Sequence, residues 1–232
     1  MVDDLLASKP SRVLDVGCGT GKVARLFLAK GCEVIGVEPD SRMASVARSQ
    51  DIPVEVANFE TWDAAHRMFD LVVSGQAWHW IDPSVGPRKA AAMLPPGAQL
   101  AIFWNRGRHD AVTKAAFDEV YMRLAPAIAK ESVPLGNKST DDADDIAAIA
   151  ATRLFAPSRR RTYGWVQKYS RDQWLDQLGT HSDHIALESE QLAALFDAVG
   201  SAIDRRGGSI TVHYETQLIS AQRIESRTIT PA

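Results

Sequence analysis

The chain has 232 residues and is predicted to be an α/β protein, with a doubly wound, mostly parallel sheet and helices on both of its faces. Two observations predict this class. Short apolar runs of strand length alternate with helical segments through the first half of the chain, as in consecutive βαβ units. A turn that contains three glycines follows the first apolar run, at the position where folds of this class bind nucleotides.

The first strand is predicted over residues 13–16, an apolar run that only Asp15 interrupts. Gly17, Gly19 and Gly21 come next, and the following residues have the pattern of a helix. Glycines let the backbone approach a ligand because no Cβ stands in the way. Dinucleotide-binding turns have the spacing Gly-x-Gly-x-x-Gly, whereas this turn is Gly-x-Gly-x-Gly. The spacing therefore indicates a nucleotide-like ligand and disfavours a dinucleotide.

Glu38 follows the second predicted strand, 33–37, and lies 23 residues after Asp15. Folds of this class place an acidic side chain about 20 residues on, where its carboxylate accepts hydrogen bonds from ribose hydroxyls. Glu38 is therefore the candidate for the ribose. The alternative is that Glu38 only caps the helix that begins near Ser41. Asp40 is the expected cap of that helix.

The remaining elements are predicted from the same signals. Further strands are expected over 53–57, 70–74, 99–104, 162–169 and 209–220, and further helices over 23–30, 88–94, 110–130, 140–155, 171–178 and 188–204, with a break at 134–137. The alternation of strands and helices stops after Trp104. The basic run 159–161 is interpreted as a solvated turn, and the acidic run 141–145 as an exposed helix start.

The composition indicates which partners and which cellular compartment to expect for this protein. The formal net charge is −3, with 26 basic and 29 acidic residues, so bulk charge does not indicate a nucleic-acid partner. Two cysteines, Cys18 and Cys32, are too few for a disulfide framework and are expected to be reduced in a cytoplasmic protein. The sequence shows neither a signal peptide nor a long apolar run, so no membrane association is expected.

Four segments carry a resemblance to a known family. Residues 13–21, 36–40 and 94–98 are similar to the glycine turn, the second-strand end and the turn before strand five of Rossmann-like S-adenosylmethionine (SAM) methyltransferases. Residues 74–82 resemble the fourth-strand loop of the trans-aconitate-like, small-molecule members of the type 11 branch. The resemblance implies seven strands in the order 3-2-1-4-5-7-6 with the last antiparallel. It also implies one domain over 1–232, with a helical cap insertion at about 107–160.

The resemblance implies that SAM is the cofactor. It also implies which residues of this chain bind SAM. Asp15 is expected to steady the turn and to interact with the methionine ammonium, and Glu38 to hold the ribose diol. Gln76 is expected at the methionine end. The other implied cofactor contacts are Gly17, Gly19 and Gly21 along the turn, and Pro39, Met43, Asn58, Phe59 and Glu60 around the adenine.

The acceptor is expected to bind near the run Trp78, His79 and Trp80, which follows strand four. His79 is the candidate catalytic residue, and three roles stay open for it: a general base, a group that orients the substrate, or a structural histidine. One of the two tryptophans is expected to pack in the core. Asn105, Arg106 and His181 are further candidates for contacts to the acceptor. His181 and His184 offer only two metal ligands, so no metal is expected.

These observations predict a SAM-dependent methyltransferase that acts on a small organic molecule, at a carboxylate or hydroxyl oxygen. The expected partner is this small-molecule acceptor, and the protein is expected to be a monomer or homodimer. One alternative is a SAM-binding protein without catalytic activity, since only eleven residues precede Arg12. The other is an NAD-dependent oxidoreductase, which the glycine spacing disfavours.

Overall fold

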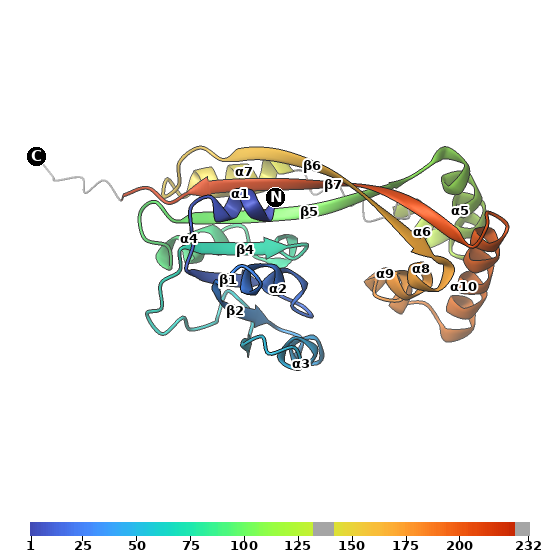
Figure 1. The fold of residues 1–232 in the computed structure, drawn as a ribbon, viewed down its shortest axis with the longest axis horizontal. Helices are drawn as coiled ribbons and strands as arrows, with labels where there is room; N and C mark the ends of the chain where they lie inside the picture. Colours follow the sequence, from blue (N-terminus) through green and yellow to red (C-terminus); the bar gives the residue numbers. More distant parts are fainter. Residues whose placement is uncertain (132–141, 226–232) are drawn as a thin grey trace, which may run out of the picture. The chain divides into compact units, whose positions relative to one another are not determined.

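The structure, a computed structural model, describes residues 1–131 and 142–225. Its sheet has seven strands in the order β3-β2-β1-β4-β5-β7-β6, which confirms the predicted topology (Figure 1). The first five strands pair in parallel, and β7 runs antiparallel to its neighbours. The strands are β1 Arg12–Val16, β2 Glu33–Glu38, β3 Val54–Val56, β4 Leu71–Gly75, β5 Gln99–His109, β6 Arg159–Ser170 and β7 Ser209–Gln222.

Helices connect these strands in the described part of the chain. They are α1 Val2–Leu6, α2 Lys22–Leu28, α3 Ser41–Arg48, the 3₁₀ turn η1 Trp78–Trp80, α4 Gly86–Ala92, α5 Ala111–Leu124, α6 Pro126–Glu131, α7 Asp142–Ala151, α8 Arg171–Leu178, α9 Ser182–Ile185 and α10 Ser189–Asp204. None of the described helices is both long and apolar enough to cross a membrane.

The largest differences from the predicted elements concern one helix, the fifth strand and the basic run. The helix expected over 110–130 is two helices, because Pro126 has no backbone N–H and begins α6 after the end of α5 at Leu124. Strand β5 continues past Trp104 to His109. The basic run 159–161 is not a turn but the start of β6, and its side chains are exposed. Strand β6 lies at the sheet edge, and most of its residues are exposed. The predicted break at 134–137 lies outside the described residues.

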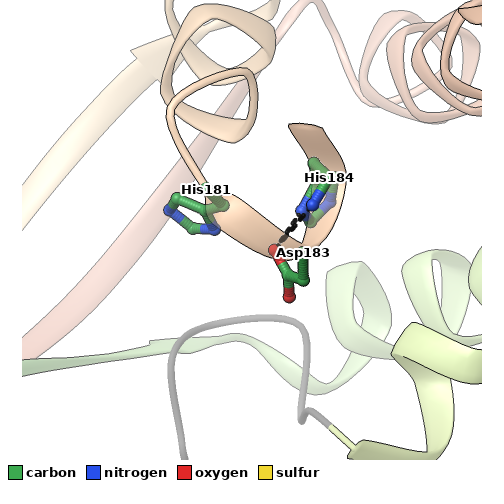
Figure 2. A group of neighbouring side chains, drawn as sticks. All are labelled: His181, Asp183 and His184. Atoms are coloured by element: carbon green, nitrogen blue, oxygen red, sulfur yellow. Dashed lines mark hydrogen bonds and ion pairs between the residues drawn. The ribbon is translucent and has the colours of Figure 1, made fainter. Parts of the chain in front are cut away.

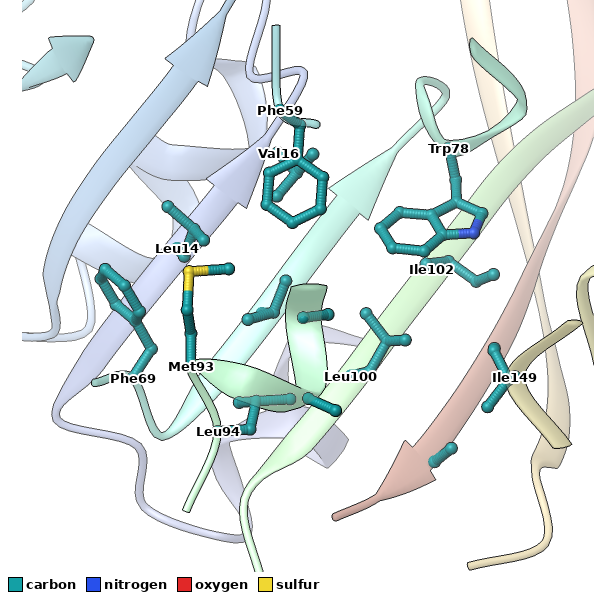
Figure 3. Packing of buried hydrophobic residues seen from close by; sticks show 14 of the residues in the cluster. Leu14, Val16, Phe59, Phe69, Trp78, Met93, Leu94, Leu100, Ile102 and Ile149 are labelled. Carbon is teal, nitrogen blue, oxygen red and sulfur yellow. The ribbon is translucent and has the colours of Figure 1, made fainter. Parts of the chain in front are cut away.

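The hydrophobic core beneath the sheet follows the alternation of side chains along the strands. Leu14, Val72 and Leu100 occupy paired positions of β1, β4 and β5, so they form a row on one face. All three belong to a buried cluster that also takes in Trp78 from η1 and Ile149 from α7 (Figure 3). Asp15 lies between Leu14 and Val16, and therefore points to the opposite face.

The chain contains two compact units. Of the described residues, the first unit holds 1–104, 142–162 and 217–225, and the second holds 105–131 and 163–216. The second unit has its own apolar core, built from α5, α6, α8, α10 and the start of β7. The predicted cap insertion at about 107–160 overlaps the second unit only in part, because α7 belongs to the first unit. Its role as a substrate cap stays a prediction.

Candidate functional site

The candidate site lies at the carboxyl ends of β1, β2 and β4. These strands are parallel, so their carboxyl ends meet at one edge of the sheet. The chain order reverses at β1, whose neighbours are β2 and β4. Open α/β sheets bind ligands at such a switch point. The glycine turn directly follows β1, Glu38 is the last residue of β2, and Gln76 directly follows β4.

Two of the three turn glycines are required by packing. All three have positive φ, at +66° for Gly17, +56° for Gly19 and +82° for Gly21, which suits glycine and strains other residues. A Cβ on Gly17 would lie 2.4 Å from the Cβ of Ala77, in the loop after β4. A Cβ on Gly21 would lie 2.2 Å from Cδ1 of Ile52. Neither distance is possible between carbon atoms that are not bonded.

Gly19 is different, because the space beside it is open. The nearest atom to a Cβ built there is Sδ of Met43, at 3.9 Å. Met43 is itself 41% exposed on α3. A ligand can therefore approach the backbone at Gly19, and the residue that would flank it is one of the predicted adenine contacts. The spacing of the glycines alone did not separate this position from its two neighbours.

Glu38 holds the open side of the turn in place. Its carboxylate is buried, with Oε2 accepting the backbone N–H of Gly19 and Oε1 accepting that of Asp40, both at 2.9 Å. Each oxygen keeps a second lone pair that can accept a hydroxyl hydrogen. Asp40 caps α3 by accepting the N–H of Arg42 at 2.8 Å, which confirms the cap prediction. The Arg42 side chain is the largest cause that lowers the Asp40 pKa to about 2.

Asp15 lies beneath the same turn and is completely buried. Among the described residues, neither of its carboxylate oxygens has a hydrogen-bonding partner. Burial raises the pKa of Asp15 to about 7; the backbone of Ala24 acts in the opposite direction, and the charge of Glu38 adds to the increase. A buried carboxylate without a partner favours its protonated form, and a nearby cation would favour the ionised form.

The residues expected around the adenine have different environments. Asn58 and Pro39 are exposed, as Met43 is. The side chain of Phe59 is buried in the core, with its ring centroid 6.2 Å from that of Trp78 (Figure 3). Only its backbone is therefore placed to meet a ligand. Glu60 accepts the backbone N–H of Asp82 at 2.9 Å and so links this segment to the loop after η1.

The loop after β4 places His79 near the glycine turn. Gln76 is exposed with φ +62°, an unusual value for a residue other than glycine, and donates its N–H to the carbonyl of Phe103 at 2.9 Å. Trp78 is buried in the core, as expected for one of the two tryptophans, and Trp80 is 73% exposed. His79 is exposed between them. Its Nδ1 accepts the indole N–H of Trp104 at 3.3 Å.

Three of the expected acceptor contacts, Asn105, Arg106 and His181, belong to the second unit. Oδ1 of Asn105 accepts the hydroxyl hydrogen of Thr216 at 2.7 Å. The same hydroxyl accepts the indole N–H of Trp165 at 2.9 Å. The amide of Asn105 is therefore held in one orientation by β6 and β7. Trp165 and Thr216 were not among the predicted site residues.

His181, Asp183 and His184 form a cluster on and beside α9 (Figure 2). His184 is buried; its Nδ1 lies 2.8 Å from Oδ1 of Asp183, and its Nε2 lies 2.7 Å from the hydroxyl of Tyr121. The bond to His184 is the largest cause that lowers the Asp183 pKa. Burial, and secondarily His184, lowers the pKa of His181. Both ring nitrogens of His184 are engaged, so a metal would have to displace a hydrogen bond.

The sheet order, the glycine turn and the buried Glu38 together define a nucleotide-binding protein of the Rossmann-like class. A family model described as a methyltransferase domain matches residues 2–127, which is more than half of the chain. The chain therefore belongs to this family, within the SAM-dependent methyltransferase superfamily, as its motifs predicted.

Individual relatives match shorter stretches. An uncharacterized methyltransferase of Mycobacterium tuberculosis is 36% identical over 107 residues, which is 45% of this chain and 44% of the relative. A malonyl-[acyl-carrier protein] O-methyltransferase of Enterobacter lignolyticus is 36% identical over 106 residues, 43% of this chain and 42% of that protein. The chain thus spans less than half the length of these curated relatives.

Solved structures share the fold over nearly the whole chain. A proposed type II methyltransferase of Anaeromyxobacter dehalogenans has a TM-score of 0.65 at 22% identity, covering 93% of this chain and 91% of that one. A phosphoethanolamine N-methyltransferase of Haemonchus contortus, solved with S-adenosylhomocysteine, has a TM-score of 0.51 at 16% identity, covering 96% and 53%. At these identities the likeness establishes the fold.

The open space at Gly19 predicts a loss of binding when it is filled. Gly19→Val is expected to abolish binding of S-adenosylhomocysteine in calorimetry, because the new side chain occupies the ligand's approach. Gly31→Val is the control, since Gly31 also has positive φ, at +84°, with no atom within 4 Å of a built Cβ. Gly21→Ala is expected instead to lower the free energy of unfolding by about 2–5 kcal/mol. Equal affinity of folded Gly19→Val and Gly31→Val would contradict this assignment.

The raised pKa of Asp15 predicts a pH-dependent stability. The folded protein holds this proton from about pH 4 to about pH 7, where the unfolded chain releases it, so the free energy of unfolding falls as pH rises through that window. Relative to Asp15→Asn, the wild type is expected to lose about 2–3 kcal/mol between about pH 5 and pH 8. Urea unfolding of both proteins measures this difference, with the exposed Asp51→Asn variant as the control. Parallel pH curves would show that Asp15 is already ionised in the free protein.

Proposed function

We propose that the chain is a SAM-dependent methyltransferase that methylates a small organic molecule at an oxygen atom. The observation that carries the proposal is the open backbone at Gly19, tied to the buried carboxylate of Glu38 at the switch point of the sheet. Packing fixes the turn on both sides and leaves this one position accessible. That is the arrangement expected of a cofactor site rather than of a structural turn.

The chain's residues fit the chemical groups of SAM. Glu38 has carboxylate lone pairs for a ribose diol, and its charge would repel a 2′-phosphate. Asp15 is a buried carboxylate to which the ammonium and sulfonium charges of SAM would bring compensation. Met43 and Pro39 offer exposed surfaces beside Gly19 and Glu38 for the adenine. Gln76 directly follows β4 and is the proposed contact for the methionine end. When bound, SAM supplies an electrophilic methyl group on a positively charged sulfur.

The oxygen target is supported by the names of the relatives. Besides the malonyl-[acyl-carrier protein] O-methyltransferase, the chain is 30% identical over 131 residues to a trans-aconitate 2-methyltransferase of Mycobacterium ulcerans, covering 53% of this chain and 49% of that protein. These relatives share only part of their length with this chain, so the acceptor itself is inferred by class. The oligomeric state, a monomer or homodimer, and the cytoplasmic location of the protein both remain predictions.

The ribose assignment predicts the effect of Glu38→Gln. The neutral amide removes the charge that strengthens hydrogen bonds to the diol, so affinity for S-adenosylhomocysteine is expected to fall by about 1.5–3 kcal/mol, roughly 10- to 150-fold. Calorimetry on the folded variant measures it. Glu33→Gln is the matched control, because Glu33 lies on the same strand at the opposite end. Unchanged affinity in Glu38→Gln, or binding of NAD by the wild type, would overturn the assignment.

If the protein methylates oxygen, a screen of candidate methyl acceptors should give oxygen-methylated products. The protein is incubated with SAM and separate panels of carboxylic acids, phenols and alcohols, and amines, and mass spectrometry follows S-adenosylhomocysteine and the methylated product. Esters or ethers are expected. Methylation confined to the amines would contradict the oxygen target. Tight SAM binding without S-adenosylhomocysteine formation in any panel would favour the non-catalytic alternative.

A further inference from the structure

The hydrogen bond between Trp104 and His79 bears on which role His79 can take. His79 lies on η1, which follows β4, and Trp104 lies in the neighbouring parallel strand β5. Trp104 comes directly after Phe103, which pairs with Gly75 at the end of β4. Trp104 is 6% exposed, so its indole is held by the core. His79 is exposed at the carboxyl edge of the sheet, two residues after Ala77, which packs on Gly17 of the glycine turn.

The hydrogen bond fixes where the imidazole carries its proton. The indole nitrogen of tryptophan is only a donor, so the histidine nitrogen that faces it must supply a lone pair. That nitrogen is Nδ1, 3.3 Å from Nε1 of Trp104. A neutral imidazole has one lone pair and one N–H. With the lone pair of Nδ1 engaged, the proton is on Nε2, and His79 offers an N–H donor there.

An imidazole in this state is unsuited to general-base catalysis. A base needs a lone pair within reach of the proton that it removes. Here Nε2 already carries a proton, and Nδ1 faces the buried indole. Protonation of Nδ1 would also set two N–H groups against each other. The hydrogen bond therefore disfavours the base among the three roles that the sequence left open for His79. The exposure of His79 at the edge of the sheet favours the orienting role over a structural one.

We propose that Trp104 is a positioning residue that holds His79 as an Nε2–H donor for an anionic oxygen of the methyl acceptor. The proposal rests on the proposed methyltransferase function and narrows the acceptor to a carboxylate or similarly ionised group. In such a reaction a carboxylate lone pair forms the new oxygen–carbon bond and the carbon–sulfur pair returns to sulfur, so an anion and a sulfonium become an ester and a thioether. No proton is transferred, and the site needs no base.

The tautomer can be measured in the free protein by ¹⁵N-histidine labelling and long-range ¹H–¹⁵N correlation at neutral pH. The chain has six histidines, and loss of one set of signals in His79→Gln assigns His79. The wild type is expected to show a protonated Nε2 and an unprotonated Nδ1. A wild-type His79 with its proton on Nδ1 overturns the proposal, whether or not any variant folds.

Trp104→Phe tests the positioning role, since it removes the indole N–H and keeps an aromatic ring. The His79 nitrogens are then expected to move toward the averaged shifts of a mixture of tautomers, while circular dichroism and thermal unfolding of the variant report that the fold is kept. Trp80→Phe is the matched control, because the Trp80 ring also lies beside that of His79, with ring centroids 5.0 Å apart. Unchanged His79 shifts in folded Trp104→Phe would overturn the role of Trp104.

The donor role is then separated from a base by kinetics on an acceptor from the screen. Glutamine also presents an N–H, so His79→Gln is expected to keep kcat within about tenfold, whereas His79→Ala raises KM by tenfold or more. A fall of about 10²–10⁴ in kcat for His79→Gln would identify a base and overturn the donor role. The tautomer measurement needs neither cofactor nor acceptor, so a failure of the methyltransferase function would not be mistaken for a failure of this inference.

Discussion

The attachment of the glycine turn to strand β2 is the constraint on which the site depends. The backbone N–H groups of Gly17 and Cys18 donate to the carbonyl of Val37 at 2.8 and 3.2 Å, and that of Gly19 donates to Glu38. A turn with three glycines at alternate positions has many conformations in isolation, and these bonds select one. That conformation buries Asp15, brings Ala77 against Gly17 and leaves Gly19 accessible. The loop that carries His79 is positioned through the same contact.

The first five strands and the helices between them could be predicted from sequence because they are short, apolar and buried. The apolar runs of β1, β2 and β4 end at a glycine or an acidic residue, and these local signals agree with the fold. The later elements were harder. The two halves of the helix expected over 110–130 share one periodicity, and only Pro126 separates them. Strand β6 was predicted over 162–169, but its start at 159–161 was not, because three exposed basic residues are equally typical of a turn.

The sequence was enough to name candidate residues of the site, but not to say what each of them does there. Spacing identified Gly19 and Glu38 as candidates, yet it treated Gly17 and Gly21 as equivalent to Gly19, and only the positions of Ala77 and Ile52 distinguish them. Phe59 was expected at the adenine, but a phenyl ring beside apolar neighbours gains more from the core. Trp104 escaped attention because a tryptophan ending an apolar strand has the pattern of a core residue. Its indole N–H matters only once β4 and β5 are paired.

The carboxylates of Glu38 and Asp15, which both lie at the glycine turn, have opposite hydrogen-bonding environments. This difference has a thermodynamic consequence for ligand binding. Glu38 accepts two backbone N–H groups, whereas burial raises the pKa of Asp15 to about 7, so Asp15 is partly protonated at neutral pH. A cationic ligand that stabilises the carboxylate must expel this proton. Ligand affinity is then linked to proton release, and the heat of binding contains the heat of protonation of the buffer that accepts the proton. Asp15 thus makes the binding equilibrium a measure of proton activity as well as of ligand concentration.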